Sequence, residues 1–162
     1  MSLQIVPLDV RAHDRENFSC GVAPLDRYLR ELATQHRRKG LSVTYVLADD
    51  VNARHILGYY SVSTAALQLE ALSDADRRKL PAYPIPAVRI GRLAVSLTGR
   101  GQGFGELLLQ NAIKRSMAAG EDIGIHAVVV DAKDETAARF YKKYGFRPCT
   151  GSELQWYLPL GR

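Results

Sequence analysis

The stretch Arg100-Gly101-Gln102-Gly103-Phe104-Gly105 is the most informative part of this sequence. It lies between a β-rich stretch that ends at Val95 and an apolar helical pattern that continues through Met117. Glycines at alternate positions keep side chains away from the backbone, so successive N–H groups can face an anion. The start of the following helix adds amide donors, and Arg100 adds a permanent positive charge. The stretch predicts an anion-binding turn, with a plain packing turn as the alternative.

The neighbouring residues narrow the choice of anion. A Walker loop needs Lys and then Ser or Thr after its last glycine, whereas Glu106 and Leu107 follow Gly105 here. The dinucleotide fingerprint G-x-G-x-x-G follows an early strand, whereas this G-x-G-x-G motif lies past the middle of the chain. The expected anion is therefore the pyrophosphate of some other carrier molecule.

Hydrophobic periodicity on both sides of the loop predicts a mixed α/β order, with an antiparallel hairpin followed by a βαβα unit. The helix from Pro24 to Arg38 and the strand from Ile123 to Val130, apolar enough to be covered on both faces, are the clearest elements. The other expected strands are Leu3 to Val6, Val43 to Ala48, Ile56 to Thr64, Arg89 to Val95 and Leu154 to Leu158. The other expected helices are Ser73 to Leu80, a helix that follows Gln102 and is closed by Gly120, and Asp134 to Lys143.

Length and composition exclude several classes of protein. A chain of 162 residues without a linker or repeat predicts one domain over residues 1–162. No apolar run approaches the roughly 20 residues of a membrane span, and the N-terminus has no signal-peptide pattern, so we expect a cytoplasmic protein. Cys20 and Cys149 lack metal-ligand spacing, so we expect free thiols and no metal. The net charge of +5, with 16 of the 22 cations Arg, makes a polyanionic ligand plausible.

The loop resembles the acetyl-CoA motif R/Q-x-x-G-x-G/A of the GNAT superfamily of N-acetyltransferases, which Arg100, Gly103 and Gly105 match. The resemblance extends to the preceding strand and to a helix that resembles N-x-x-A-x-x-F-Y-x-x-x-G-F, in which Asp134 replaces the usual Asn. It implies a mixed, mostly antiparallel sheet flanked by helices, and acetyl-CoA as cofactor. The cofactor-binding residues that it implies are Leu93, Ala94, Val95, Arg100, Gly101, Gln102, Gly103, Phe104, Gly105, Asp134 and Phe140.

Outer segments narrow the resemblance to one branch, the tRNA-acetylating toxins of bacterial toxin-antitoxin modules. These segments are Phe18-x-Cys20-Gly21, Leu25-Asp26, Tyr28-Leu29, Pro84-x-Pro86 and Val130-Asp131-Ala132. The branch implies charged tRNA as substrate, acetylated on its amino acid α-amine. It also implies an antitoxin with a ribbon-helix-helix domain and a homodimer.

Tyr141 is the expected catalytic residue, because the matching tyrosine of the family donates a proton to the departing CoA thiolate. Without the motif, Tyr141 would be a packing residue of an aromatic helix face. An α-amine of pKa near 7.7 to 8.0 needs little help from a base, which suits a sequence without an obvious catalytic carboxylate. His126 is a possible base by type, but we expect it to be a core histidine within a strand.

Arginines at helical spacing predict a basic face on the first helix, opposite its apolar stripe. Together with cations elsewhere, this face is a plausible contact for an RNA backbone, although a solvated face is the simpler alternative. The candidate tRNA-binding residues are Arg27, Arg30, Arg37, Arg38, Arg77, Arg78 and Arg92. The rival functions are a GNAT enzyme that acetylates a small amine or a protein N-terminus, and a catalytically silent acyl-CoA or RNA-binding module.

Overall fold

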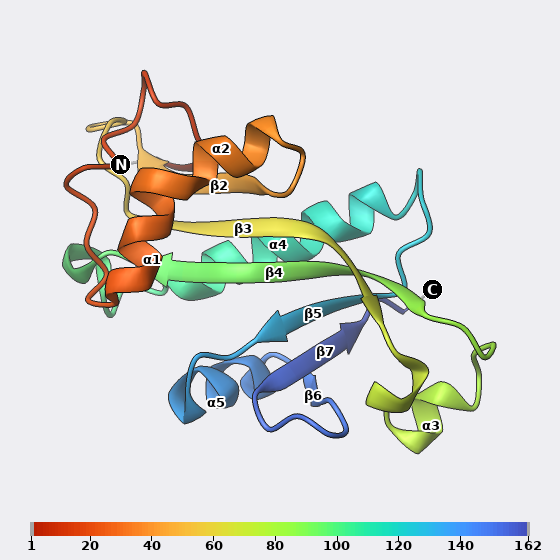
Figure 1. The fold of residues 1–162 in the computed structure, drawn as a ribbon. Helices are drawn as coiled ribbons and strands as arrows, with labels where there is room; N and C mark the ends of the chain where they lie inside the picture. Colours follow the sequence, from red (N-terminus) through yellow and green to blue (C-terminus); the bar gives the residue numbers. More distant parts are fainter. Residues whose placement is uncertain (1, 162) are drawn as a thin grey trace. The chain divides into compact units, whose positions relative to one another are not determined.

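The chain contains both strands and helices in the computed structural model, which describes residues 2–161 (Figure 1). Within these residues the strands form a seven-stranded sheet in the order β1-β2-β3-β4-β5-β7-β6. The β4–β5 pair is parallel, whereas β1–β2, β2–β3, β5–β7 and β6–β7 are antiparallel. The strands are β1 (Leu3–Pro7), β2 (Val43–Asp49), β3 (Gly58–Leu67), β4 (Ile85–Val95), β5 (Ala127–Asp131), β6 (Arg147–Pro148) and β7 (Gln155–Pro159). The expected mixed, mostly antiparallel sheet is confirmed.

The helices are α1 (Ala23–Arg27), α2 (Ala33–Arg38), α3 (Asp74–Arg77), α4 (Phe104–Ala119) and α5 (Glu135–Lys143), with single turns at η1 (Tyr28–Leu32), η2 (Leu69–Ala71) and η3 (Leu97–Gly99). Contacts divide the chain into two compact units. Unit 1 contains residues 2–63 and 91–113, and unit 2 contains residues 64–90 and 114–161. Because β3, β4 and α4 each run through both units, neither unit is a continuous stretch of sequence. That residues 1–162 form one domain stays a prediction, and its end residues Met1 and Arg162 lie outside the described residues.

Two neighbouring tyrosines of β3 organise the core of unit 1. Side chains alternate between the two faces of a strand, so Tyr59 and Tyr60 point in opposite directions. Tyr59 packs with Tyr28, Leu29 and other residues of the helical segment 23–38, which Figure 1 shows beside β2 and β3. The Tyr60 hydroxyl donates to Oδ1 of Asn111 in α4, at 2.6 Å. Both tyrosines are fully buried, so the first part of β3 is covered on both faces.

The core of unit 2 is built on β5, whose residues Ala127 to Val130 are fully buried. Ala127 and Val129 pack in one cluster with Tyr157 of β7 and with Leu72 from the segment around α3. The expectation of a central strand covered on both faces is therefore confirmed. The strand begins later than the predicted Ile123, because the backbone N–H of Ile123 still bonds to the carbonyl of Ala119 in the turn after α4.

Several other expected bounds are also corrected. The strand expected to begin at Arg89 begins at Ile85, since the Pro86 carbonyl pairs with the N–H of His126 although proline itself lacks a donor. The helix expected from Ser73 to Leu80 is only α3, with the Ser73 hydroxyl accepting from the Asp76 N–H as its cap. The short strand β6 was not expected at all.

The helical segment of residues 23–38 contains an irregular turn. It is α-helical in α1 and α2, but η1 between them is a π-helix. A π turn holds one more residue than an α turn, so it rotates every later side chain about the helix axis. Sequence periodicity predicts that this segment is helical, but it does not predict the rotation of the side chains that follow the π turn.

Cys20 and Cys149 are free, as expected, and both are buried. Burial raises the pKa of the Cys149 thiol to about 11, so it stays protonated at neutral pH. Among the described residues, no helix is both long enough and apolar enough to cross a membrane. Across the same part of the chain, no group of His, Cys, Asp and Glu side chains has the geometry of a metal site.

Candidate active site

The glycine loop of unit 1 lies where the sequence predicts it, between β4 and α4. Gly101 and Gly103 have φ angles of 79° and 78°, a left-handed conformation that side chains with a Cβ rarely adopt. A Cβ built on either glycine meets no atom within 4 Å. The first turn of α4 follows at once and has amide N–H groups without intrahelical acceptors. Open space beside these amides is what an anion-binding turn requires.

Other residues of the loop hold it in place. The Arg100 Nη2 donates to the carbonyl oxygen of Cys20 at 3.0 Å, and the remaining guanidinium N–H groups are further donors for an anion. The Gln102 side-chain amide donates to the Thr98 carbonyl. Phe104 is only 4% exposed and packs beside Gly99, so its contribution to a ligand site is limited to its backbone. Gly105 lies in the first turn of α4.

The strand segment expected to bind the cofactor ends β4. Leu93 and Val95 are half-buried, and Ala94 is buried in the core of unit 1. A Cβ on Gly58 of β3 would lie 2.8 Å from the Ala94 carbonyl oxygen, so the two backbones approach closely here. Ser96, directly after the strand, donates its N–H to the Leu57 carbonyl. This end of β4 is therefore held rigidly from the β3 side.

Tyr141 belongs to unit 2 and is 6% exposed. Its ring packs between Phe140 and Phe146, with ring centroids 5.3 and 5.4 Å away. Burial, helped by the negative charge of Asp131, raises the Tyr141 pKa to about 12. The phenol is therefore neutral at physiological pH and keeps its proton available for donation.

Asp134 has a structural role that the sequence resemblance does not include. Its Oδ1 accepts a hydrogen bond from the Ala137 N–H at 2.9 Å and so caps α5. This carboxylate oxygen is engaged with the protein backbone, whereas Phe140, one turn before the helix end, is half-buried with its ring against Tyr144.

The prediction of a single basic face on the first helix is wrong. Arg27 and Arg30 line one cavity of unit 1 together with Arg92, whereas Arg37 lines another cavity with Asp9 and Thr44. The physical reason is the π turn η1, which contains Arg30 and rotates Arg37 and Arg38 relative to the residues before it. Arg38 is exposed at the end of α2.

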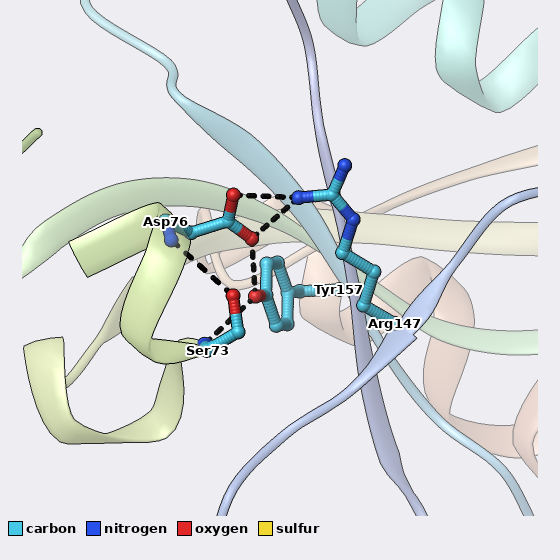
Figure 2. Close-up of polar contacts among 4 residues, drawn as sticks. All are labelled: Ser73, Asp76, Arg147 and Tyr157. Carbon is cyan, nitrogen blue, oxygen red and sulfur yellow. Dashed lines mark hydrogen bonds and ion pairs between the residues drawn. The ribbon is translucent and has the colours of Figure 1, made fainter. Parts of the chain in front are cut away.

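The cations Arg77 and Arg78 lie on and after α3 of unit 2, both exposed. Arg77 forms an exposed ion pair with Asp74. Figure 2 shows how the short helix is fastened: the Arg147 guanidinium donates to both oxygens of Asp76 at 2.6 and 2.5 Å, and the Tyr157 hydroxyl donates to Oδ2 at 2.5 Å. These bonds hold the pKa of Asp76 at about 2, mainly through the Arg147 hydrogen bond.

Sequence analysis missed this network, because its members lie 71 and 81 residues apart and no local pattern joins them. His126 is also placed differently from expectation. It is half-buried just before β5 and borders a small cavity with Tyr83 and Ile125, so it is not a core histidine within a strand.

Comparison with known proteins agrees with this architecture. The family model described as "Acetyltransferase (GNAT) domain" matches residues 40–148. The chain belongs to the GNAT family of acetyltransferases, and the resemblance seen in its motifs is confirmed.

Its similarity is to one kind of member in particular. A relative from Mycobacterium tuberculosis described as a tRNA-acetylating toxin is 33% identical over 135 residues, which cover 83% of this chain and 79% of the relative. The solved structure of AtaT complexed with acetyl-methionyl-tRNAfMet is 32% identical, with a TM-score of 0.91 and coverage of 98% and 95% of the two chains. A tyrosine-to-phenylalanine mutant of AtaT, bound to the C-terminus of the antitoxin AtaR and to acetyl-CoA, is 30% identical, with a TM-score of 0.83 and coverage of 98% and 93%.

Proposed function

We propose that this acetyltransferase transfers the acetyl group of acetyl-CoA to the α-amino group of aminoacyl-tRNA, and that it acts as a toxin by blocking translation. The observation that carries the proposal is the similarity, over 98% of the chain, to a protein solved with acetyl-methionyl-tRNAfMet. An acetylated α-amine can no longer attack an ester, so such a product cannot accept a growing peptide.

The residues of unit 1 fit acetyl-CoA. The open space over Gly101 and Gly103, beside the amides that begin α4, suits a pyrophosphate. Arg100 adds charge to this cradle, and the Leu93, Ala94 and Val95 backbone would hold the extended arm of the cofactor. Bound acetyl-CoA supplies a thioester carbonyl that an amine can attack.

The chain itself has two tasks in the reaction. Backbone N–H groups near Leu93 to Val95 stabilise the negative charge that develops on the thioester oxygen. The neutral Tyr141 hydroxyl donates its proton toward the departing sulfur, whose thiol form has a pKa of about 8.5. An α-amine of pKa near 7.7 to 8.0 has a substantial deprotonated fraction near neutral pH, far larger than that of a Lys amine of pKa about 10.4, so the proposal needs no dedicated base. Asp134 and Phe140 would border the cofactor from α5.

The proposal includes partners and a compartment. The relative solved with the C-terminus of an antitoxin supports regulation by a co-encoded antitoxin, for which we propose a ribbon-helix-helix DNA-binding domain. We further propose a homodimer in the cytoplasm, where charged tRNA is found. The basic residues of both units, including Arg37, Arg38, Arg77 and Arg78, would contact the tRNA backbone.

The test is acetyl transfer from radiolabelled acetyl-CoA to charged tRNA, uncharged tRNA, small amines and N-terminal peptides. We expect label only in charged tRNA, released as an N-acetyl amino acid after mild alkaline hydrolysis of the ester. Label in peptides or small amines alone would support the rival acetyltransferase function. Binding of acetyl-CoA without any turnover would indicate a silent binding module.

A further inference from the structure

A cavity of about 500 Å³ in unit 1 combines positive charge with apolar walls. Its charged residues are Arg27, Arg30 and Arg92, and its apolar lining includes Pro24, Leu32 and the ring of Tyr28. A site for a simple anion needs no apolar walls, and a site for an apolar ligand needs no arginines. The volume lies in the range of small-ligand pockets.

Arg92 is held in place by an aromatic ring. Its guanidinium carbon lies 3.6 Å from the centroid of the Tyr28 ring, a cation–π contact. Tyr28 is 1% exposed, and its hydroxyl is hydrogen-bonded to Oγ of Ser42 at 2.6 Å and to Nδ1 of His36 at 3.1 Å. A fixed ring covers one face of the guanidinium, so Arg92 offers its remaining surface to the cavity as a preorganised planar group.

The other two arginines are suited to contact phosphates. Arg27 is exposed and bonds through Nε to Glu31 at 2.9 Å, which orients its side chain while the Nη groups remain as further donors. Arg30 is half-buried, and its carbonyl accepts from Nη1 of Arg15, which brings a further positive charge nearby. Arg15, Arg27, Arg30 and Arg92 outnumber the two carboxylates of the helical segment 23–38, which are Asp26 and Glu31.

We propose that this cavity binds the unpaired 3′-terminal nucleotide of the acceptor RNA, with its base stacked on Arg92 and its phosphates against Arg27 and Arg30. Bases of unpaired nucleotides stack on aromatic rings and guanidinium planes, whereas paired bases in a duplex are not accessible in this way. The inference rests on the proposed function, which names the RNA as the acceptor and places the thioester at the end of β4.

Position along β4 supports the assignment. Arg92 directly precedes Leu93 to Val95, the segment proposed to hold the thioester end of the cofactor. At about 3.3 Å per strand residue, Val95 lies about 10 Å from Arg92. A nucleotide stacked on Arg92 would thus direct its esterified amino acid along this short stretch of strand toward the acetyl group.

The experiment measures binding without catalysis. The probe is an uncharged RNA hairpin with a single-stranded 3′ overhang, whose terminal base is the fluorescent analogue 2-aminopurine, and the control probe is the same hairpin with a blunt end. We expect wild-type protein to bind the overhang more tightly and to quench its fluorescence through stacking. Equal affinity for both probes, or binding without quenching, would overturn the inference.

Two charge-conserving variants separate stacking from charge. Arg92→Lys keeps the charge and loses the planar group, so we expect quenching to disappear and overhang affinity to fall about 5- to 150-fold, the range for loss of one stacked base. Arg30→Lys is the matched control, with affinity within about threefold and quenching retained. Equal losses in the two variants would overturn the stacking assignment. Acetyl-CoA calorimetry on each variant verifies its fold.

A peptide competition and a separate acetylation assay distinguish the remaining alternatives. A glutamate-rich peptide that displaces the overhang at equal concentration would identify the cavity as a peptide site and also overturn the inference. Acetylation of charged tRNA is measured separately on wild-type protein. Its failure with intact overhang binding would refute the proposed function, whereas normal acetylation without overhang binding would refute this inference alone.

Discussion

Replacing Gly103 by Ala tests the anion loop against a control that the same unit provides. Gly103 and Gly40 have similar φ angles of 78° and 72°, and a Cβ built on either one meets no atom within 4 Å. A left-handed conformation costs a residue with a Cβ about 1–2 kcal/mol. Gly103→Ala and Gly40→Ala should therefore destabilise the fold equally, with Tm lower by about 2–8 °C for a chain of this size.

The two variants should differ in cofactor binding. The Cβ at position 103 enters the open space that the pyrophosphate is proposed to fill, and displacement of the phosphate would break at least one charged hydrogen bond worth about 1.5–3 kcal/mol. Acetyl-CoA should then bind about 10- to 100-fold more weakly to Gly103→Ala by calorimetry, because 1.4 kcal/mol corresponds to tenfold in Kd. Gly40→Ala should keep the wild-type Kd. A wild-type Kd for Gly103→Ala, or equal losses in both variants, would refute the loop assignment.

Three further predictions concern unit 2. Tyr141→Phe should lower kcat about 100-fold or more and leave the acetyl-CoA Kd unchanged, whereas Tyr144→Phe on the same turn should keep the wild-type kcat. Equal kcat values for the two variants would show that Tyr141 is a packing residue only. Tyr157→Phe removes a hydroxyl that donates to Asp76 and accepts from the Ser73 N–H, so the free energy of unfolding in urea should fall by about 2–4 kcal/mol. The control Tyr83→Phe, at an exposed tyrosine, should change it by less than about 0.5 kcal/mol. The folded pKa of Asp76 is about 2, below its ordinary 3.8, so its contribution to stability is present above pH 4 and is lost as pH falls to 2. Asp76→Asn should therefore flatten the dependence of the unfolding free energy on pH between 4 and 2, and an unchanged slope would contradict the assigned pKa.

Local chemistry explains which parts of the fold are predictable from sequence. The helix starts at Ser73 and Asp134 and the glycine turn before α4 depend on neighbouring residues, and each lies where its pattern predicts. The buried strand β5 also follows from a local apolar run, although it begins at Ala127 and not at Ile123. The bonds of Asp76 to Arg147 and Tyr157 join residues far apart in the sequence, so periodicity and capping rules contain no signal for them.

The residues of the candidate site also fall into those that a local motif predicts and those that only folding brings together. Tyr141 and the glycine loop are predictable because each belongs to a contiguous motif. The grouping of Arg92 with Arg27 and Arg30 depends on how a helix packs beside a strand whose Arg92 lies 62 residues after Arg30, which only the folded chain reveals. The separation of Arg37 from these residues depends on one irregular turn, for which no sequence rule was available.

The π turn at Tyr28–Leu32 makes the cation arrangement tolerant of the loss of a single codon. Because this turn holds one residue more than an α turn, deleting one residue within it would restore an uninterrupted α-helix and leave the residues that follow at nearly the same angle about the helix axis. Arg37 and Arg38 would then keep their present side, without any change in net charge. Among homologues, a one-residue gap at this point would thus preserve the electrostatic surface, whereas a gap within regular helix just before Arg37 would turn the later arginines by about 100°.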